Sequence, residues 1–144
     1  MSTPPSIAPI DALTLLFRLS LSLLVGAAIG LERQSQNKPA GLRTYMLVSF
    51  GAALFAILPI QLGLAVQSAD AFTRIIQGII SGVSFIGAGT ILRDQTIQGL
   101  TTAAAIWVTA ALGVIISCGF WELGLISALV CWFILKVLKK IELK

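Results

Sequence analysis

The stretch GVSFIGAGTILRDQTIQGLTTAAAIWVTAAL, residues 82–112, is crowded with glycine, alanine, serine and threonine. Two helices built from its arms would be able to touch backbone to backbone. Both arms are apolar enough for lipid, and Arg93 and Asp94 mark the hinge between them. Because lipid offers little hydrophobic drive between helices, small side chains and hydroxyl bonds must supply the adhesion. The stretch therefore predicts the packing centre of a membrane bundle.

The composition of the whole chain points the same way. The 144 residues are 57% hydrophobic and only 11% charged, and the mean hydropathy is +0.97. A soluble domain carries about 25% charged residues. One membrane span takes about 20 apolar residues, so five spans would use most of the chain. The predicted fold is therefore all-α, a polytopic membrane protein with a bundle of about five transmembrane helices.

The apolar runs also predict the domain organisation. Residues 1–9 form a proline-rich, flexible N-terminal tail, 10–138 form the transmembrane domain, and 139–144 form a basic cytoplasmic tail. A short polar connection, 67–73, follows the second span. The predicted spans are 10–31, 42–64, 74–92, 100–116 and 122–137.

Basic residues predict the orientation, because loops rich in lysine and arginine stay in the cytoplasm. Only Arg74 lies on one side of the predicted bundle. The N-terminus is therefore expected outside and the C-terminus inside. Eight basic residues lie on the inner side: Arg33, Lys38, Arg43, Arg93, Lys136, Lys139, Lys140 and Lys144.

Several function classes are disfavoured. The net charge is +4, but the basic residues punctuate apolar runs instead of clustering, so we expect no nucleic-acid partner. Cys118 and Cys131 form no CxxC pair, and the chain has no histidine. Neither a nucleotide-binding loop nor an aspartyl-phosphate motif is present, so we expect no enzyme and no cofactor. The sequence does not identify metal ligands, and these stay unknown.

Polar residues line one face of the first span. A charged side chain inside a span costs at least about 2.5 kcal/mol, so Arg18 should face protein, a partner or water. Two interpretations stay open: a polar seam used by an ion or partner, or an Arg18 that snorkels towards Asp11 and merely fixes the bundle. Arg74 is the other intramembrane basic residue. The seam, within about a third of the helix circumference, comprises Asp11, Thr14, Arg18, Ser22 and Glu32.

Glycines at GxxxG spacing predict close helix contacts in the first and third spans. These contacts can lie within one chain or between chains, and a homo-oligomer stays open. The predicted packing glycines are Gly26, Gly30, Gly78, Gly82, Gly87, Gly89 and Gly99. Residues 41–54 also align with 99–112, either as parallel repeats or through chance similarity of alanine-rich helices.

An ordered series of motifs resembles the membrane domain of the MgtC/SapB family. It comprises GLER at 30–33, AGLRT at 40–44, GAAL at 51–54, Arg74, FIGAG at 85–89, GLTTAA at 99–104 and Trp107. The resemblance implies a bacterial inner-membrane protein linked to magnesium limitation and to restraint of the F-type ATP synthase. Tyr45 stands where the family often has histidine, and Ser84 where glycine is usual. A role that needs the family's soluble C-terminal domain does not carry over to these residues.

Mg²⁺ prefers carboxylate and other oxygen ligands, and no acidic residue lies at the centre of a predicted span. We therefore expect a non-enzymatic regulator or accessory protein in the bilayer, with a membrane-protein partner such as ATP synthase or a Mg²⁺ transporter. The alternative is a small oligomeric ion channel or carrier.

The expected functional surface is a cluster on the inner side. Glu32 should pair with Arg43 there, with the first amides of the second helix bonding the carboxylate. The cluster either meets a partner or gates a pore mouth, or it is a solvated ion pair worth at most about 1 kcal/mol. Its members are Glu32, Arg33, Arg43, Thr44, Arg93 and Asp94.

Overall fold

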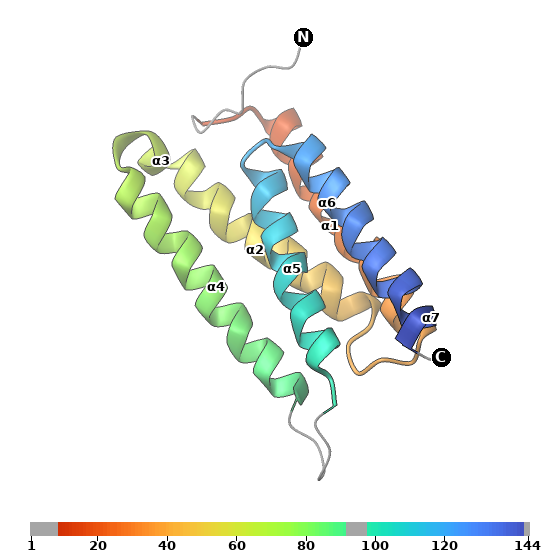
Figure 1. Ribbon diagram of the computed structural model, residues 1–144. Helices are drawn as coiled ribbons and strands as arrows, with labels where there is room; N and C mark the ends of the chain where they lie inside the picture. Colours follow the sequence, from red (N-terminus) through yellow and green to blue (C-terminus); the bar gives the residue numbers. More distant parts are fainter. Residues whose placement is uncertain (1–8, 92–97, 143–144) are drawn as a thin grey trace.

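The computed structural model describes residues 9–91 and 98–142, and the secondary structure within these ranges consists of helices joined by short turns (Figure 1). Five helices are long and apolar enough to cross a membrane, which confirms the predicted fold. The last of them is one rod formed by α6, the π-helix η1 and α7. The elements are α1 (Ala12–Ser35), α2 (Leu42–Gln61), α3 (Leu64–Gln67), α4 (Ala69–Ile91), α5 (Leu100–Ser117), α6 (Trp121–Phe133), η1 (Ile134–Leu138) and α7 (Lys139–Glu142).

Capping residues explain where the helices differ from the predicted spans. The Asp11 side chain accepts bonds from the Thr14 amide at 3.1 Å and its hydroxyl at 2.7 Å, so it caps α1 and lies outside the span. The same bonds lower the pKa of the exposed Asp11 carboxyl. Ser68 accepts from the Ala71 amide at 3.2 Å and so starts α4 at Ala69, inside the predicted connection 67–73.

The first helix ends later than predicted. It continues to Ser35, so Glu32 and Arg33 are part of a helix and not of a loop. The rod of the fifth span likewise runs to α7, beyond predicted residue 137. A helix can continue past the end of a span into the water layer where its side chains are polar, because its backbone hydrogen bonds stay within the helix.

The closest helix contacts lie between α1 and α2 and between α2 and α5. A Cβ added at Gly26 would lie 2.6 Å from the Tyr45 carbonyl oxygen, and one at Gly30 would lie 2.8 Å from the Leu42 Cα. A Cβ at Gly113 of α5 would collide with the Ser49 backbone of α2. The packing centre is therefore α1, α2 and α5.

The prediction that residues 82–112 form the packing centre is wrong for the α4 half. A Cβ added at Gly87 would lie at an ordinary 3.5 Å from the Ala103 Cβ of α5, whereas one at Gly99, in a positive-φ turn, would collide with the Thr90 carbonyl. Cβ atoms at Gly78, Gly82 and Gly89 would meet nothing within 4 Å. Within one chain these three glycines make no close helix contact, and a contact between chains stays a prediction.

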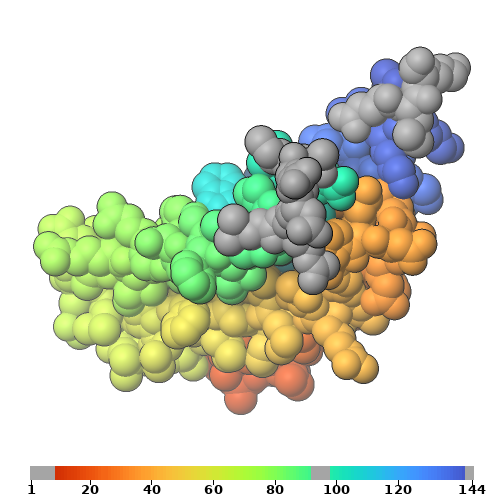
Figure 2. Space-filling view, turned by 90° about the horizontal axis from the view of Figure 1, so that it is seen from below, coloured from red at the N-terminus to blue at the C-terminus, as the bar shows by residue number. Residues whose placement is uncertain are grey.

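The view along the bundle explains why α4 is so open (Figure 2). The helix lies at one side of the molecule, and the α6 rod lies at the opposite side. Only Ile79, Val83 and Gly87 of α4 are buried. Gly78 and Gly82 of α4 therefore line a groove beside α2, while α5 occupies the middle of the bundle. In Figure 1, α2 and α5 run in the same direction, as the proposed repeat requires.

Candidate functional site

A buried arginine near the end of α1 links three helices. Arg33 is only 2% exposed, and its Nη2 donates to the Thr102 hydroxyl at 2.9 Å. The Tyr45 hydroxyl donates to the Thr102 carbonyl oxygen at 3.3 Å, and its side chain also interacts with Arg33. We call Arg33, Tyr45 and Thr102 the Arg33 network. It joins α1, α2 and the first turn of α5.

The Arg33 network is electropositive and short of acceptors. The Arg33 Nε is buried without a hydrogen-bond partner. The positive end of the α5 dipole lies beside this guanidinium, because Thr102 is the third residue of α5. No acidic side chain that the structure describes is buried. Burying a charge without an ionic partner costs folding free energy. The packing of the surrounding helices must therefore offset the cost of burying Arg33.

The predicted pair between Glu32 and Arg43 is not formed. The Glu32 carboxylate accepts from Gln36 Nε2 on its own helix, whereas Arg43 is exposed. Gln34 Oε1 accepts from the Leu42 amide at 3.1 Å, so an amide caps α2 in place of the expected carboxylate. The reason is helix geometry, since Gln34 lies about 200° around α1 from Glu32.

The remaining members of the predicted cluster are spread out. Thr44 is half-buried in the first turn of α2. Arg93 and Asp94 lie outside the described residues. Of the four cluster members that the structure describes, only Arg33 thus enters a polar network inside the bundle.

Arg18 lies at the other end of the bundle. It is 6% exposed, and its Nη1 donates to the carbonyl oxygen of Ser117, the last residue of α5, at 2.8 Å. This bond joins α1 to the end of α5, in place of the expected pair between Arg18 and Asp11. A role of Arg18 towards an ion or partner stays a prediction. It also lies beside Cys118, where burial raises the pKa of the thiol and the Arg18 charge offsets part of that rise.

The predicted polar seam is not continuous. Asp11 and Thr14 bond to each other at the start of α1, and the buried Ser22 hydroxyl donates to the Leu19 carbonyl at 2.7 Å. Arg74, the other predicted intramembrane residue, is exposed near the start of α4. Among residues 9–91 and 98–142, no three histidine, cysteine, aspartate or glutamate side chains gather as a metal site.

Sequence reasoning missed Thr102, Gln34 and the role of Tyr45. One signal was available, since GxxxG glycines indicate where another backbone approaches. The α2 segment around Tyr45 is the one that approaches Gly26 and Gly30. The Tyr45 Cβ lies 3.1 Å from a Cβ added at Gly30. Glycines on α1 thus bring the Tyr45 side chain within reach of Arg33.

Comparison with known proteins supports the same assignment as the motifs. The profile of the MgtC family matches residues 19–144. The chain belongs to the MgtC family. This MgtC-family match includes every residue of the Arg33 network and all five membrane helices except the first turns of α1. The resemblance seen in the sequence is thereby confirmed, and with it a multi-pass protein in a lipid bilayer.

Several named relatives are similar in sequence to this MgtC-family chain. Protein SrpB of Synechococcus elongatus is 46% identical over 92% of the chain and 79% of SrpB. Escherichia coli K12 YhiD, whose name provisionally describes a magnesium transporter, is 44% identical over 90% of the chain and 62% of YhiD. Salmonella typhimurium MgtC is 39% identical over 80% of the chain but only 48% of MgtC. No solved structure matches.

Proposed function

We propose that this chain is a non-enzymatic regulator of magnesium homeostasis in a bacterial inner membrane. Membership of the MgtC family and the magnesium-related name of the relative YhiD support the physiological context. The chain spans about half the length of MgtC, so a role in restraining the F-type ATP synthase is a proposal that rests on the family resemblance.

The proposed regulator role rests on the sign of the charges that are buried inside the bundle. Both buried ionic side chains among the described residues, Arg18 and Arg33, are positive, and they lie near opposite ends of the bundle. Mg²⁺ needs oxygen ligands in a near-octahedral array and would be repelled by both guanidinium groups. The interior of one chain therefore suits rigid support better than cation passage.

The surface that we assign to a partner is the end of the bundle that carries the Arg33 network. Glu32 and Arg43 lie there at or near the surface, and the Arg33 network lies beneath them, where α1, α2 and α5 meet. Glu32 and Arg43 offer charges of both signs there, and Thr44 adds a hydroxyl; Arg93 and Asp94, the other predicted members of this surface, lie outside the described residues. The partner would be a membrane protein, either ATP synthase or a magnesium transporter.

Growth measurements test this surface. Glu32→Ala and Arg43→Ala should reduce growth at low magnesium in a strain that depends on this chain, while the protein level in the membrane stays normal. Asp70→Ala is the matched control, because this exposed carboxylate lies at the opposite end of the bundle. Normal growth of both variants at normal abundance would contradict the assignment.

The second candidate is an oligomeric ion channel or carrier, favoured by the transporter name of YhiD. In that case the path would run between chains and not through one bundle. Liposomes that contain only the purified protein and a magnesium-sensitive dye decide between the two. If the chain is a regulator, liposomes that contain it should take up magnesium no faster than empty liposomes. If it is a transporter, the rate of magnesium uptake should rise in proportion to the amount of protein.

A further inference from the structure

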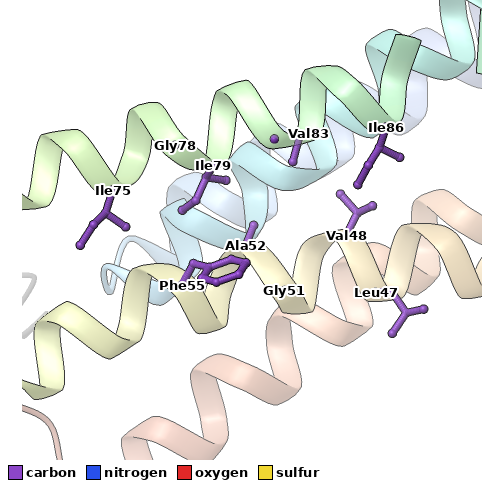
Figure 3. A pocket seen from close by; sticks show the side chains of 11 residues that line it. Leu47, Val48, Gly51, Ala52, Phe55, Ile75, Gly78, Ile79, Val83 and Ile86 are labelled. Carbon is purple, nitrogen blue, oxygen red and sulfur yellow. The ribbon is translucent and has the colours of Figure 1, made fainter. Parts of the chain in front are cut away.

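A groove of about 470 Å³ lies between α2 and α4, on the side of the bundle away from α6 (Figure 3). Every residue that lines it is apolar. The groove exists because glycines stand on both walls, Gly51 on α2 and Gly78 and Gly82 on α4, where added Cβ atoms would meet nothing within 4 Å.

The groove is long and narrow. On α4 it extends from Ile75 to Ile86, which at about 1.5 Å per residue is a length of about 16 Å. Phe55 and Leu47 stand near its two ends on α2 (Figure 3). This length suits an extended hydrocarbon chain, and the apolar lining offers nothing to a polar ligand.

An exposed cation lies on α4 just before the first residue that lines the groove. Arg74 is exposed, lies one turn before the lining residue Gly78, and is next to the lining residue Ile75. Its side chain leaves α4 tilted towards the helix start, which is the end nearest the water layer. Asp70, one turn earlier, makes no ion pair with it, nor does any other residue of the described ranges.

We propose that the α2–α4 groove binds an acyl chain of an anionic phospholipid and that Arg74 binds the lipid phosphate. The apolar groove fits the hydrocarbon part, and the planar guanidinium matches phosphate oxygens in a two-bond geometry. Charge complementarity at one end and apolar complementarity along the wall thus select one amphipathic ligand. This lipid site is separate from the surface assigned to the partner protein.

Native mass spectrometry of the purified protein, incubated with phosphatidylglycerol or phosphatidylcholine, tests the site. The natural chain should retain phosphatidylglycerol. Arg74→Gln should weaken that binding about tenfold, and Arg74→Lys should restore part of it. The double variant Gly78→Leu with Gly82→Leu should abolish binding because it fills the groove.

Two controls share the same chemistry. Gly89→Leu adds the same side chain to an open position of α4 outside the groove, and Arg43→Gln removes a cation from the opposite end. Both should bind lipid as the natural chain does. A monodisperse elution profile and an unchanged helical circular dichroism spectrum show that each variant is folded.

Three results would overturn the proposal. Equal retention of phosphatidylcholine would show that Arg74 selects no anionic headgroup. Unchanged lipid binding by the glycine double variant would place the lipid elsewhere. A shift from dimer to monomer in that double variant, with lipid binding unchanged, would show that the groove receives a helix of a second chain.

Discussion

Arg18 and Arg33 are two buried arginines of one helix, and they meet opposite electrostatic conditions. Arg18 donates to the last carbonyl of α5, where the helix dipole is negative, so its charge is favourable there. Arg33 lies at the first turn of α5, where the dipole is positive, and its Nε has no partner. Arg18 is therefore expected to stabilise the fold, whereas Arg33 is expected to be kept for function.

This contrast gives a matched pair of variants. Arg18→Met should lower the free energy of unfolding by about 1–3 kcal/mol, because the buried Ser117 carbonyl loses its charged donor. Arg33→Met should change it by less than about 1 kcal/mol, or raise it, because an apolar side chain removes an unpaired buried charge. Denaturant or thermal unfolding in one detergent measures both.

The order of the two effects is the decisive result. A larger loss of stability in Arg33→Met than in Arg18→Met would contradict the dipole argument. If Arg33→Met is stable but fails the low-magnesium growth test, the Arg33 network supports the functional surface, as proposed.

Among the helices, the same glycine spacing has two different outcomes. Gly26 and Gly30 of α1 face α2 at distances that leave no room for a side chain, whereas Gly78 and Gly82 of α4 face open space. Gly30→Leu should therefore destabilise the protein by at least about 1–3 kcal/mol or remove it from the membrane. Gly82→Leu, which the sequence alone predicts to be disruptive, should leave the fold intact.

Membrane abundance and melting temperature of the two variants check this prediction. Gly89→Leu again serves as the reference for an open position. Loss of the folded monomer in Gly82→Leu would mean that α4 packs more closely than the structure shows.

The sequence predicted the helices well because hydrophobic length alone defines a span. It also predicted that Arg18 would avoid lipid, since a charge there is costly. It did not predict which face of α4 is buried, because lipid and protein interior are equally apolar and leave no contrast along the helix. The partner of Glu32 was wrong for a related reason: α1 runs to Ser35, so the side chains there follow helical and not loop geometry.

At the scale of the whole molecule, the connection after α1 and the end of the last rod lie at the same end of the bundle, and α3 lies at the other (Figure 1). Because the sequence predicts eight basic residues on the side of the α1–α2 connection and Arg74 on the other, a reporter fused after Lys144 should lie in the cytoplasm. A reporter inserted near Gln67 should lie outside.

Two reporters should be fused at each position, one that is active only in the cytoplasm and one that is active only outside. Each reporter then serves as the control for the other. The reverse pattern at both positions would invert the orientation. It would also move the surface around Glu32 and Arg43 to the outer face, where no cytoplasmic partner can reach it.

The two arginine contacts of α1 also affect the order in which the protein can be made. Arg18 and Ser117 are 99 residues apart in the chain, and Arg33 and Thr102 are 69 apart. At about 5–20 residues per second, a ribosome completes α5 several seconds or more after α1 has emerged. During that interval neither arginine has its native acceptor, so we expect α1 to keep both guanidinium groups at the water layer or against protein until α5 arrives.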